Sequence, residues 1–246
     1  MIIDTFDNKS EAIISPIYDG EKIKCDACIV TFSNIIEKYV VEKYNAKKVA
    51  ETKCASGITP IYTFEDGGKT FAFYKTHVGA PISAGLLEEA IVRLDTRNFL
   101  VFGSAGVLDS ECNKKVIVPN FAYRDEGTSY HYAKAEDFIP IRNFGYVATI
   151  LQKNNIPFTV GKTWTTDAFY RETKNNLKKR QKDGCISVDM ECSALQAVAN
   201  FRRVELYYFF MSGDVLDAPE WDEEGLHGAN HNLSNFDIAL LVAHGI

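Results

Sequence analysis

The run Ile186-Ser187-Val188-Asp189-Met190-Glu191-Cys192-Ser193-Ala194-Leu195 joins an apolar strand to a helix, and two carboxylates and a thioether lie at the junction. Asp189 occupies a helix N-cap position, and apolar residues recur at helical spacing from Met190 onward. The free N–H groups and the dipole of a first helical turn favour ionised carboxylates, so Asp189 and Glu191 could accept hydrogen bonds from a ligand's hydroxyls. Both acids could equally be helix caps only, because acids are common in first turns.

Length and composition predict one domain that spans residues 1–246. The chain has 246 residues, of which 46% are hydrophobic and 12% aromatic, and no Pro/Gly/Ser-rich linker divides it. The net charge of −6 and the scattered Lys and Arg residues argue against a nucleic-acid partner. We see no N-terminal signal and no apolar stretch near the roughly 20 residues that span a bilayer, so we expect a cytoplasmic protein without a membrane partner.

The six cysteines are too few for a disulfide scaffold in a chain of this length and are typical of reduced, buried thiols. Cys25 and Cys28 form a CxxC pair, but no second pair follows at zinc-ligand spacing. His227 and His231 are four residues apart without the glutamate of a metalloprotease helix. We therefore expect no metal site.

Strands and helices alternate along the chain. Runs typical of strands lie at 48–54, 58–64, 70–75, 98–102, 115–118, 158–162, 185–188 and 204–211. Helical patterns lie at 31–43, 81–94, 142–153, 171–181, 191–202 and 232–243. The turn at 65–69, with its Gly-Gly pair, predicts a hairpin. The alternation predicts an α/β sandwich whose largely parallel or mixed sheet is flanked by helices.

Ligands of such sheets bind beyond the carboxyl ends of the strands, and three clusters follow predicted strands. Gly103-Ser104-Ala105-Gly106 could hold an anion on its N–H groups and the Ser104 hydroxyl, or could be only a tight turn. Asp189-Met190-Glu191 is the second cluster. The third contains Asp214, which follows a very apolar strand and is expected to be partly desolvated. Partial desolvation suits a general acid, although Asp214 could also cap the next turn.

These clusters carry a resemblance to a known family. The segments 103–106 (GSAG), 122–132 (AYRDEGTSYHY), 165–170 (TTDAFY), 188–191 (VDME) and 212–214 (SGD) occur in the order typical of the nucleoside phosphorylase family. That family includes purine nucleoside phosphorylases, uridine phosphorylases and methylthioadenosine nucleosidases. The similarity extends over residues 45 to 245, and its most specific part is the VDME block with the helix that follows.

The resemblance implies a single α/β domain with a central mixed, barrel-like sheet, assembled as a homo-oligomer (dimer, trimer or hexamer). It implies a pentosyltransferase of purine salvage that cleaves the N-glycosidic bond of a nucleoside with phosphate as co-substrate and without a cofactor. Such cleavage passes through an oxocarbenium-like state, so an enzyme gains by holding the sugar hydroxyls and by stabilising the departing base.

The resemblance also implies a role for each matching residue. Glu191 would accept hydrogen bonds from the ribose 2′ and 3′ hydroxyls, and Met190 would pack under the sugar. Asp214 would protonate or hydrogen-bond the leaving purine nitrogen. The other implied roles are base stacking by Phe169, with Val188 and Asp189 beside the base, and contact with the nucleophile by Gly103 and Ser104.

The chain departs from the family where phosphate should bind. Val101 stands where phosphorylases commonly have an arginine, and the chain has no arginine before Arg93. The N-terminal region that we match to the family's Gly-Asp-x-x-Arg motif, residues 15–24, offers only lysines, which lack the bidentate fork of arginine. Arg124 is a candidate substitute for binding phosphate.

Three functions therefore remain open. The Gln-x-Arg reader of uracil is absent after Phe169, and Asp214 is typical of purine-acting members, so a purine nucleoside phosphorylase is our first interpretation. The alternative is a nucleosidase, in which water replaces phosphate and Glu11 or Glu21 would be the base. The third is a catalytically weak nucleoside-binding protein on the same fold. His77 or His131 could complete a neighbouring subunit's site, as histidines do in this family.

Overall fold

A closed ring of five strands lies at the centre of the computed structural model, which describes residues 1–55, 57–217 and 224–246. Around the ring, the strands are β7 (Asn98–Val107), β12 (Glu205–Val215), β8 (Val116–Asp125), β10 (Phe158–Thr166) and β11 (Cys185–Asp189). β11 pairs antiparallel with β7 and thereby closes the ring, whereas β7–β12, β8–β10 and β10–β11 are parallel pairs. The expected mixed, barrel-like sheet is confirmed.

Four further strands extend the sheet outward from β7. β2 (Ala27–Thr31) and β5 (Lys69–Lys75) continue it in parallel, and β4 (Gly57–Asp66) and β3 (Lys47–Cys54) add antiparallel strands. The β4–β5 hairpin is confirmed, and Gly67 and Gly68 both adopt positive φ, as a tight two-residue hairpin turn requires.

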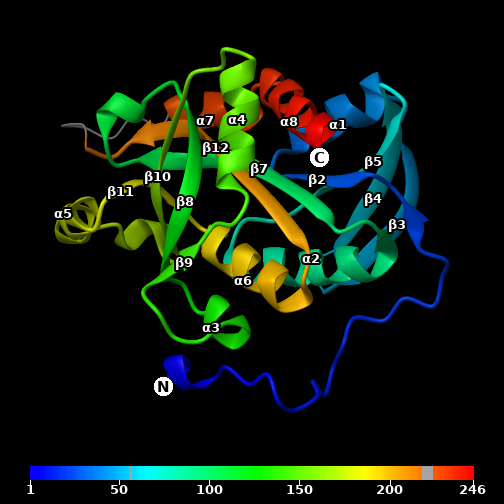
Figure 1. The fold of residues 1–246 in the computed structure, drawn as a ribbon, viewed down its shortest axis with the longest axis horizontal. Coiled ribbons are helices and arrows are strands. Elements are labelled where there is room, and N and C mark those ends of the chain that lie inside the picture. The colour runs from blue at the N-terminus through cyan, green and yellow to red at the C-terminus, as the bar shows by residue number, and fades with distance from the viewer. Residues whose placement is uncertain (56, 218–223) are drawn as a thin grey trace.

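Helices cover both faces of the sheet. Figure 1 shows α2 (Ala80–Arg93), α3 (Ser129–Tyr132) and α6 (Cys192–Arg202) below it, and α1 (Asn34–Lys43) and α4 (Phe144–Lys153) above it. The remaining elements are α5 (Lys174–Lys182), α7 (Glu224–His231), α8 (Ser234–Gly245), β1 (Ile23–Lys24), β6 (Leu94–Asp95), β9 (Phe138–Pro140) and the 3-10 turns η1 (Ile2–Asp4), η2 (Ser110–Cys112) and η3 (Phe169–Arg171). No helix in the described part of the chain combines the length and the apolar character needed to cross a bilayer.

The strands β7, β8 and β12 each contribute to two apolar cores, one on each face, and β10 and β11 contribute Trp164, Cys185 and Val188 to a third, smaller cluster. In β7, Phe99 and Val101 belong to the core between the sheet and the helices α2 and α6. Leu100 and Phe102 belong to the core between the sheet and the helices α1, α4 and α8. A strand that is buried on both faces reads as a continuous apolar run, and this is why the segments around 98–102 and 204–211 could be recognised from the sequence.

The structure corrects several of the expected elements, and α3, β9 and α7 are among those that the sequence interpretation did not predict. The sequence interpretation missed β2, whose five residues are all buried, and instead began a helix at Thr31. Gly103–Gly106 and Asp214 were expected in loops after their strands, but both lie inside strands, β7 and β12. Both segments stay within strands because the pairing of β12 with β7 continues up to Val215, with an irregularity between Ser212 and Val215.

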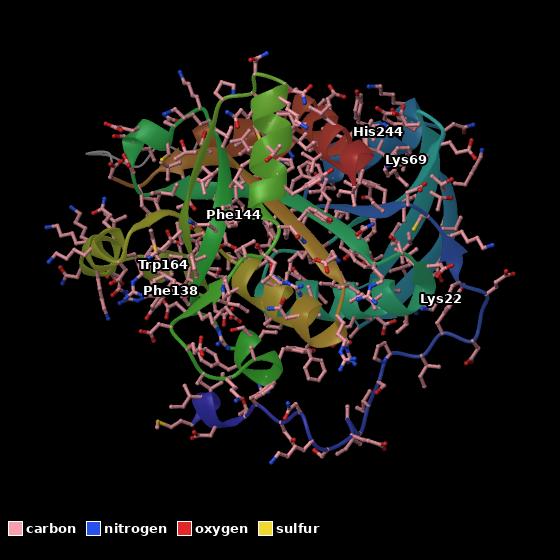
Figure 2. The ribbon with its side chains drawn as sticks, viewed as in Figure 1. Lys22, Lys69, Phe138, Phe144, Trp164 and His244 are labelled. Atoms are coloured by element: carbon pink, nitrogen blue, oxygen red, sulfur yellow. The ribbon has the colours of Figure 1, made fainter. Side chains whose placement is uncertain are left out.

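The hairpin end of the sheet is fastened to α8. The Lys69 ammonium donates to the carbonyl oxygens of His244 (2.9 Å) and Ile246 (2.8 Å), and His244 Nε2 lies 2.6 Å from Asp66 Oδ2. Figure 2 shows Lys69 and His244 beside one another near the C-terminus, far from the N-terminal segment that carries Lys22. These contacts fix the outer strands to the body of the domain.

Candidate active site

A cavity of about 690 Å³ opens where the carboxyl ends of several strands meet. Its walls come from β7, β12 and the β11–α6 junction, with Phe32 after β2, Val78 after β5 and Phe169 after β10. α7 packs against β12 and β7 and contributes Asn230 to the wall. The position agrees with the expectation that ligands bind at the carboxyl edge of the sheet.

The structure brings most of the residues predicted from the sequence into this one cavity. The predicted residues that line it are Gly103, Ser104, Phe169, Val188, Asp189, Met190, Glu191 and Asp214. Arg124 is the predicted residue that lies elsewhere.

Asp189 is a structural anchor of the site as well as part of its wall. Its Oδ1 accepts hydrogen bonds from the hydroxyls of Thr163 (3.0 Å) and Thr165 (2.9 Å) on β10. Its Oδ2 accepts from the N–H groups of Glu191 (2.8 Å) and Cys192 (2.6 Å). The N-cap residue of α6 is Glu191 and not Asp189, so the predicted N-cap position is wrong by two residues. Asp189 instead holds the turn that carries Glu191 into the cavity.

Glu191 is buried, and the Gly79 N–H donates to its Oε1 at 2.6 Å. Burial, together with the charge of Asp189, raises the pKa of Glu191 to about 8, and burial raises the pKa of Asp189 to about 6. The expectation that the first turn keeps both acids ionised is therefore wrong for Glu191 near neutral pH. The loss of hydration on burial raises the pKa of Glu191 by more than the helix N-terminus lowers it.

Asp214 lies on β12 in the cavity wall, beside Gly106 of β7. Its Oδ1 would lie 3.4 Å from a Cβ added at Gly106, and the same Cβ would approach Val188 at 2.9 Å and Leu216 at 3.0 Å. The glycine therefore leaves room for the Val188 and Leu216 side chains, and the Asp214 carboxyl lies beside them at ordinary contact distance. Asp214 is 8% exposed, in agreement with the expected partial desolvation.

Ser104 and Gly103 form the floor of the cavity. The Ser104 hydroxyl donates to Asn230 Oδ1 of α7 at 2.7 Å and retains lone pairs that can accept from a nucleophile. A Cβ at Gly103 would meet the Phe32 ring at 2.9 Å, so the glycine allows that ring to lie over β7 and line the cavity.

Arg124 is committed to the segment that follows β8. Its Nε donates to the Ser129 hydroxyl at 2.8 Å, and its terminal nitrogens donate to the carbonyl oxygens of Lys134 (2.5 Å) and Ala133 (3.3 Å). The guanidinium also stacks 4.1 Å from the centroid of the Tyr130 ring. These contacts correct the prediction that Arg124 binds substrate in the cavity of its own chain.

The N-terminal segment also lies outside the cavity. Glu11 and Glu21, the predicted bases, are exposed on it and do not line the cavity. Two loops from the first third of the chain do reach the cavity: the loop after β2 presents Phe32, and the loop after β5 presents Val78. Val101 is buried in the core, and neither His77 nor His131 lines the cavity of its own chain.

Glu172 and Tyr208 are among the wall residues that the sequence interpretation missed. Glu172 follows η3, and burial, with the charges of Asp214 and Asp189, raises its pKa to about 7. Tyr208 is buried beside Glu191, and its hydroxyl has no hydrogen-bond partner among the described residues. Period-2 alternation along 204–211 places Tyr208 on the same face as Phe210, and this signal could have identified it.

The lining is aromatic and acidic. Four carboxyl side chains reach it, and no group of three or more His, Cys, Asp or Glu side chains in the described ranges is arranged to hold a metal ion. Carboxyl groups beside aromatic rings suit a ligand that combines several hydroxyls with a flat heterocycle.

Comparisons with known proteins agree with this geometry. The DeoD-type purine nucleoside phosphorylase of Bacillus velezensis is 26% identical over 203 residues, which cover 80% of this chain and 85% of that protein. The DeoD-type enzyme of Exiguobacterium sp. is 24% identical over 213 residues, covering 84% and 86%. The solved structure of Helicobacter pylori futalosine hydrolase shares the fold, with a TM-score of 0.72 at 12% identity, and the match covers 91% of this chain and 98% of that one. The family model of the phosphorylase superfamily matches residues 27–240, and the chain therefore belongs to this superfamily, as its resemblance to the nucleoside phosphorylases predicts.

Proposed function

We propose that this protein cleaves the N-glycosidic bond of a purine nucleoside, with water as the nucleophile. The observation that carries the proposal is the convergence of Glu172, Asp189, Glu191 and Asp214 on one aromatic cavity. Carboxyl groups suit a cationic, oxocarbenium-like transition state and oppose the entry of a phosphate dianion.

Glu191 would hold the sugar. When a ribose donates from its 2′ and 3′ hydroxyls, the ionised form of Glu191 gains two charge-assisted hydrogen bonds, and these favour release of the proton that burial retains in the free protein. Met190, which follows Asp189 in the cavity wall, would pack under the pentose.

Asp214 would assist departure of the base. As the bond between C1′ and the purine nitrogen breaks, its electron pair passes to the base. Water, held by the Ser104 hydroxyl, forms the new bond to C1′ and gives up a proton. Asp214 takes up this proton and delivers it to the ring nitrogen N7, so that the base leaves neutral. The products are the free base and ribose.

Phosphorolysis is the second candidate, because the relatives that cover four fifths of this chain are purine nucleoside phosphorylases. In that case a phosphate oxygen would form the bond to C1′, and the product would be ribose 1-phosphate. A neighbouring copy could then supply the cations.

Release of free base from adenosine, inosine and uridine, measured with and without phosphate, tests the proposal. Base release that is independent of phosphate and yields ribose supports the nucleosidase. Release that requires phosphate and yields ribose 1-phosphate replaces it with the phosphorylase. Tight binding without turnover in either buffer would instead indicate a nucleoside-binding protein.

A further inference from the structure

Glu172 is a cavity carboxyl to which the proposed reaction assigns no step of its own. It follows the 3-10 turn η3, in which the Glu172 N–H donates to the Phe169 carbonyl oxygen at 3.1 Å. This turn fixes Glu172 close in sequence and space to Phe169, the residue expected to stack on the base. Both side chains line the cavity.

The charges around the cavity separate it into two ends. The charges that act on Glu191 come from Asp189 and Asp167, whereas those that act on Glu172 come from Asp214 and Asp189. Asp214 therefore lies nearer to Glu172 than to Glu191, so Glu172 and Asp214 form one end of the cavity and Glu191 forms the other. If Glu191 holds the sugar, Glu172 shares the base end with Asp214.

We propose that Glu172 recognises the exocyclic group of the purine and selects 6-aminopurine nucleosides over 6-oxopurine nucleosides. This inference rests on the proposed function, because it assumes that Asp214 contacts N7. Both base classes present N7 as an acceptor, but the neighbouring group is a donor in a 6-aminopurine and an acceptor in a 6-oxopurine. An ionised Glu172 accepts from the amino group and repels the carbonyl oxygen.

The protonation state of Glu172 makes this selectivity depend on pH. With a pKa of about 7, Glu172 is present in both forms near neutrality. The ionised form, which dominates above that pKa, accepts from the 6-amino group, and the protonated form, which dominates below it, can donate to a 6-oxo group. The charged groups that face Glu172 are Asp214 of β12 and Asp189 of β11, and both act in the same direction.

The test compares kcat/KM for adenosine and inosine in wild type, Glu172→Gln and the control Glu65→Gln, well below and well above pH 7. Glu65 is an exposed acid on β4. Wild type and Glu65→Gln should favour adenosine at high pH on the order of 10- to 100-fold, as expected of a hydrogen bond to a charged group. Glu172→Gln can donate or accept, so its ratio should fall towards one and lose its pH dependence.

The outcomes separate this inference from the proposed function. Cleavage of both nucleosides with a ratio that Glu172→Gln leaves unchanged would overturn the role of Glu172 and leave the function standing. If neither nucleoside is cleaved, the function fails, and calorimetric binding of adenine and hypoxanthine to the same variants then decides the role of Glu172. Weaker discrimination between the bases in Glu172→Gln supports that role, and equal discrimination rejects it. Thermal unfolding of each variant verifies that it is folded.

Discussion

At the scale of single residues, Glu191 links the starts of two helices. It is the N-cap residue of α6, and its carboxyl accepts a hydrogen bond from the N–H of Gly79, the N-cap residue of α2. The variant Glu191→Gln keeps the shape of the side chain and an oxygen for the Gly79 N–H, but it cannot become an anion. We expect kcat/KM to fall at least about 100-fold, the value of two charge-assisted hydrogen bonds, while the fold survives. Steady-state kinetics measures the loss of kcat/KM, and thermal unfolding measures whether the fold survives. Wild-type turnover in this variant would remove Glu191 from the mechanism.

The buried acids also predict how stability changes with pH. Glu191, Glu172 and Asp189 have pKa values of about 8, 7 and 6, all above the ordinary values near 4 of the unfolded chain. At pH values between the unfolded-state pKa values and the raised folded-state values, the folded protein binds more protons than the unfolded chain. The free energy of unfolding should therefore decrease as pH rises through this range.

Each extra proton contributes a slope of about 1.4 kcal/mol per pH unit. Chemical denaturation at several pH values between about 5 and 8.5 measures the slope. Glu191→Gln should have a smaller slope than wild type in the upper half of that range. A stability that rises with pH in the wild type would contradict the assignment.

The unpartnered hydroxyl of Tyr208 gives a second prediction about stability. A buried hydroxyl without a partner in the described structure contributes no hydrogen bond and still bears the cost of dehydration. Tyr208→Phe should therefore leave the free energy of unfolding unchanged or raise it by up to about 1 kcal/mol. Ser193→Ala is the contrast, because the Ser193 hydroxyl donates to the buried Glu126 carboxylate at 2.8 Å. Its loss should cost about 1–3 kcal/mol, and equal effects of the two variants would refute the argument.

At the scale of elements, the start of α2 depends on the backbone of Gly79, which has φ +108° and no atom within 4 Å of an added Cβ. Gly79→Ala therefore tests conformation alone, and it should destabilise the protein by about 1–3 kcal/mol. Gly85→Ala is a matched control in the same helix, where an added Cβ also meets nothing. It should stabilise by about 0.5–1 kcal/mol, so the two variants should shift the melting temperature in opposite directions.

Arg124 tests another element, the segment between β8 and β9. Because its guanidinium donates to the Ser129 hydroxyl and to the carbonyl oxygens of Ala133 and Lys134, Arg124→Lys should lower the free energy of unfolding by about 2–3 kcal/mol. The KM for the nucleoside should stay near that of wild type at a temperature where the variant is folded. A large rise in this KM would restore Arg124 to substrate binding.

The elements that the sequence predicted well are those whose pattern is repeated and local. The β11–α6 junction, the Gly67-Gly68 hairpin and the apolar runs of β7 and β12 were recognised in this way. β2 was missed because it is short and all five of its residues are buried. Such a run lacks the alternation of apolar and polar residues that marks a half-buried strand. Ring closure, the orientation of Glu172 and the packing of Arg124 depend on pairings between residues distant in sequence, such as Val188 with Gly106, which local patterns do not record.

At the scale of the whole molecule, the ring couples the two halves of the chain. β7 pairs with β2, β12 and β11, so strands from the first, middle and last thirds of the sequence share one sheet. We therefore expect residues 1–246 to unfold in one cooperative transition, with equal calorimetric and van't Hoff enthalpies. Two separate transitions would contradict the prediction of a single domain.

The cavity draws its walls from both halves of the chain, so a ligand should stabilise the whole ring. Val78 and Ser104 come from the first half, and Met190 and Asp214 come from the second. Adenine at about 100 times its Kd should raise the free energy of unfolding by about 2.7 kcal/mol, if it binds only the folded state. Native-state hydrogen exchange should then show added protection in β2, β7 and β12 alike, since these strands open together. Added protection only in β10, β11 and β12 would mean that the two halves of the chain open separately. Ligand binding would then not stabilise the closed ring as a whole.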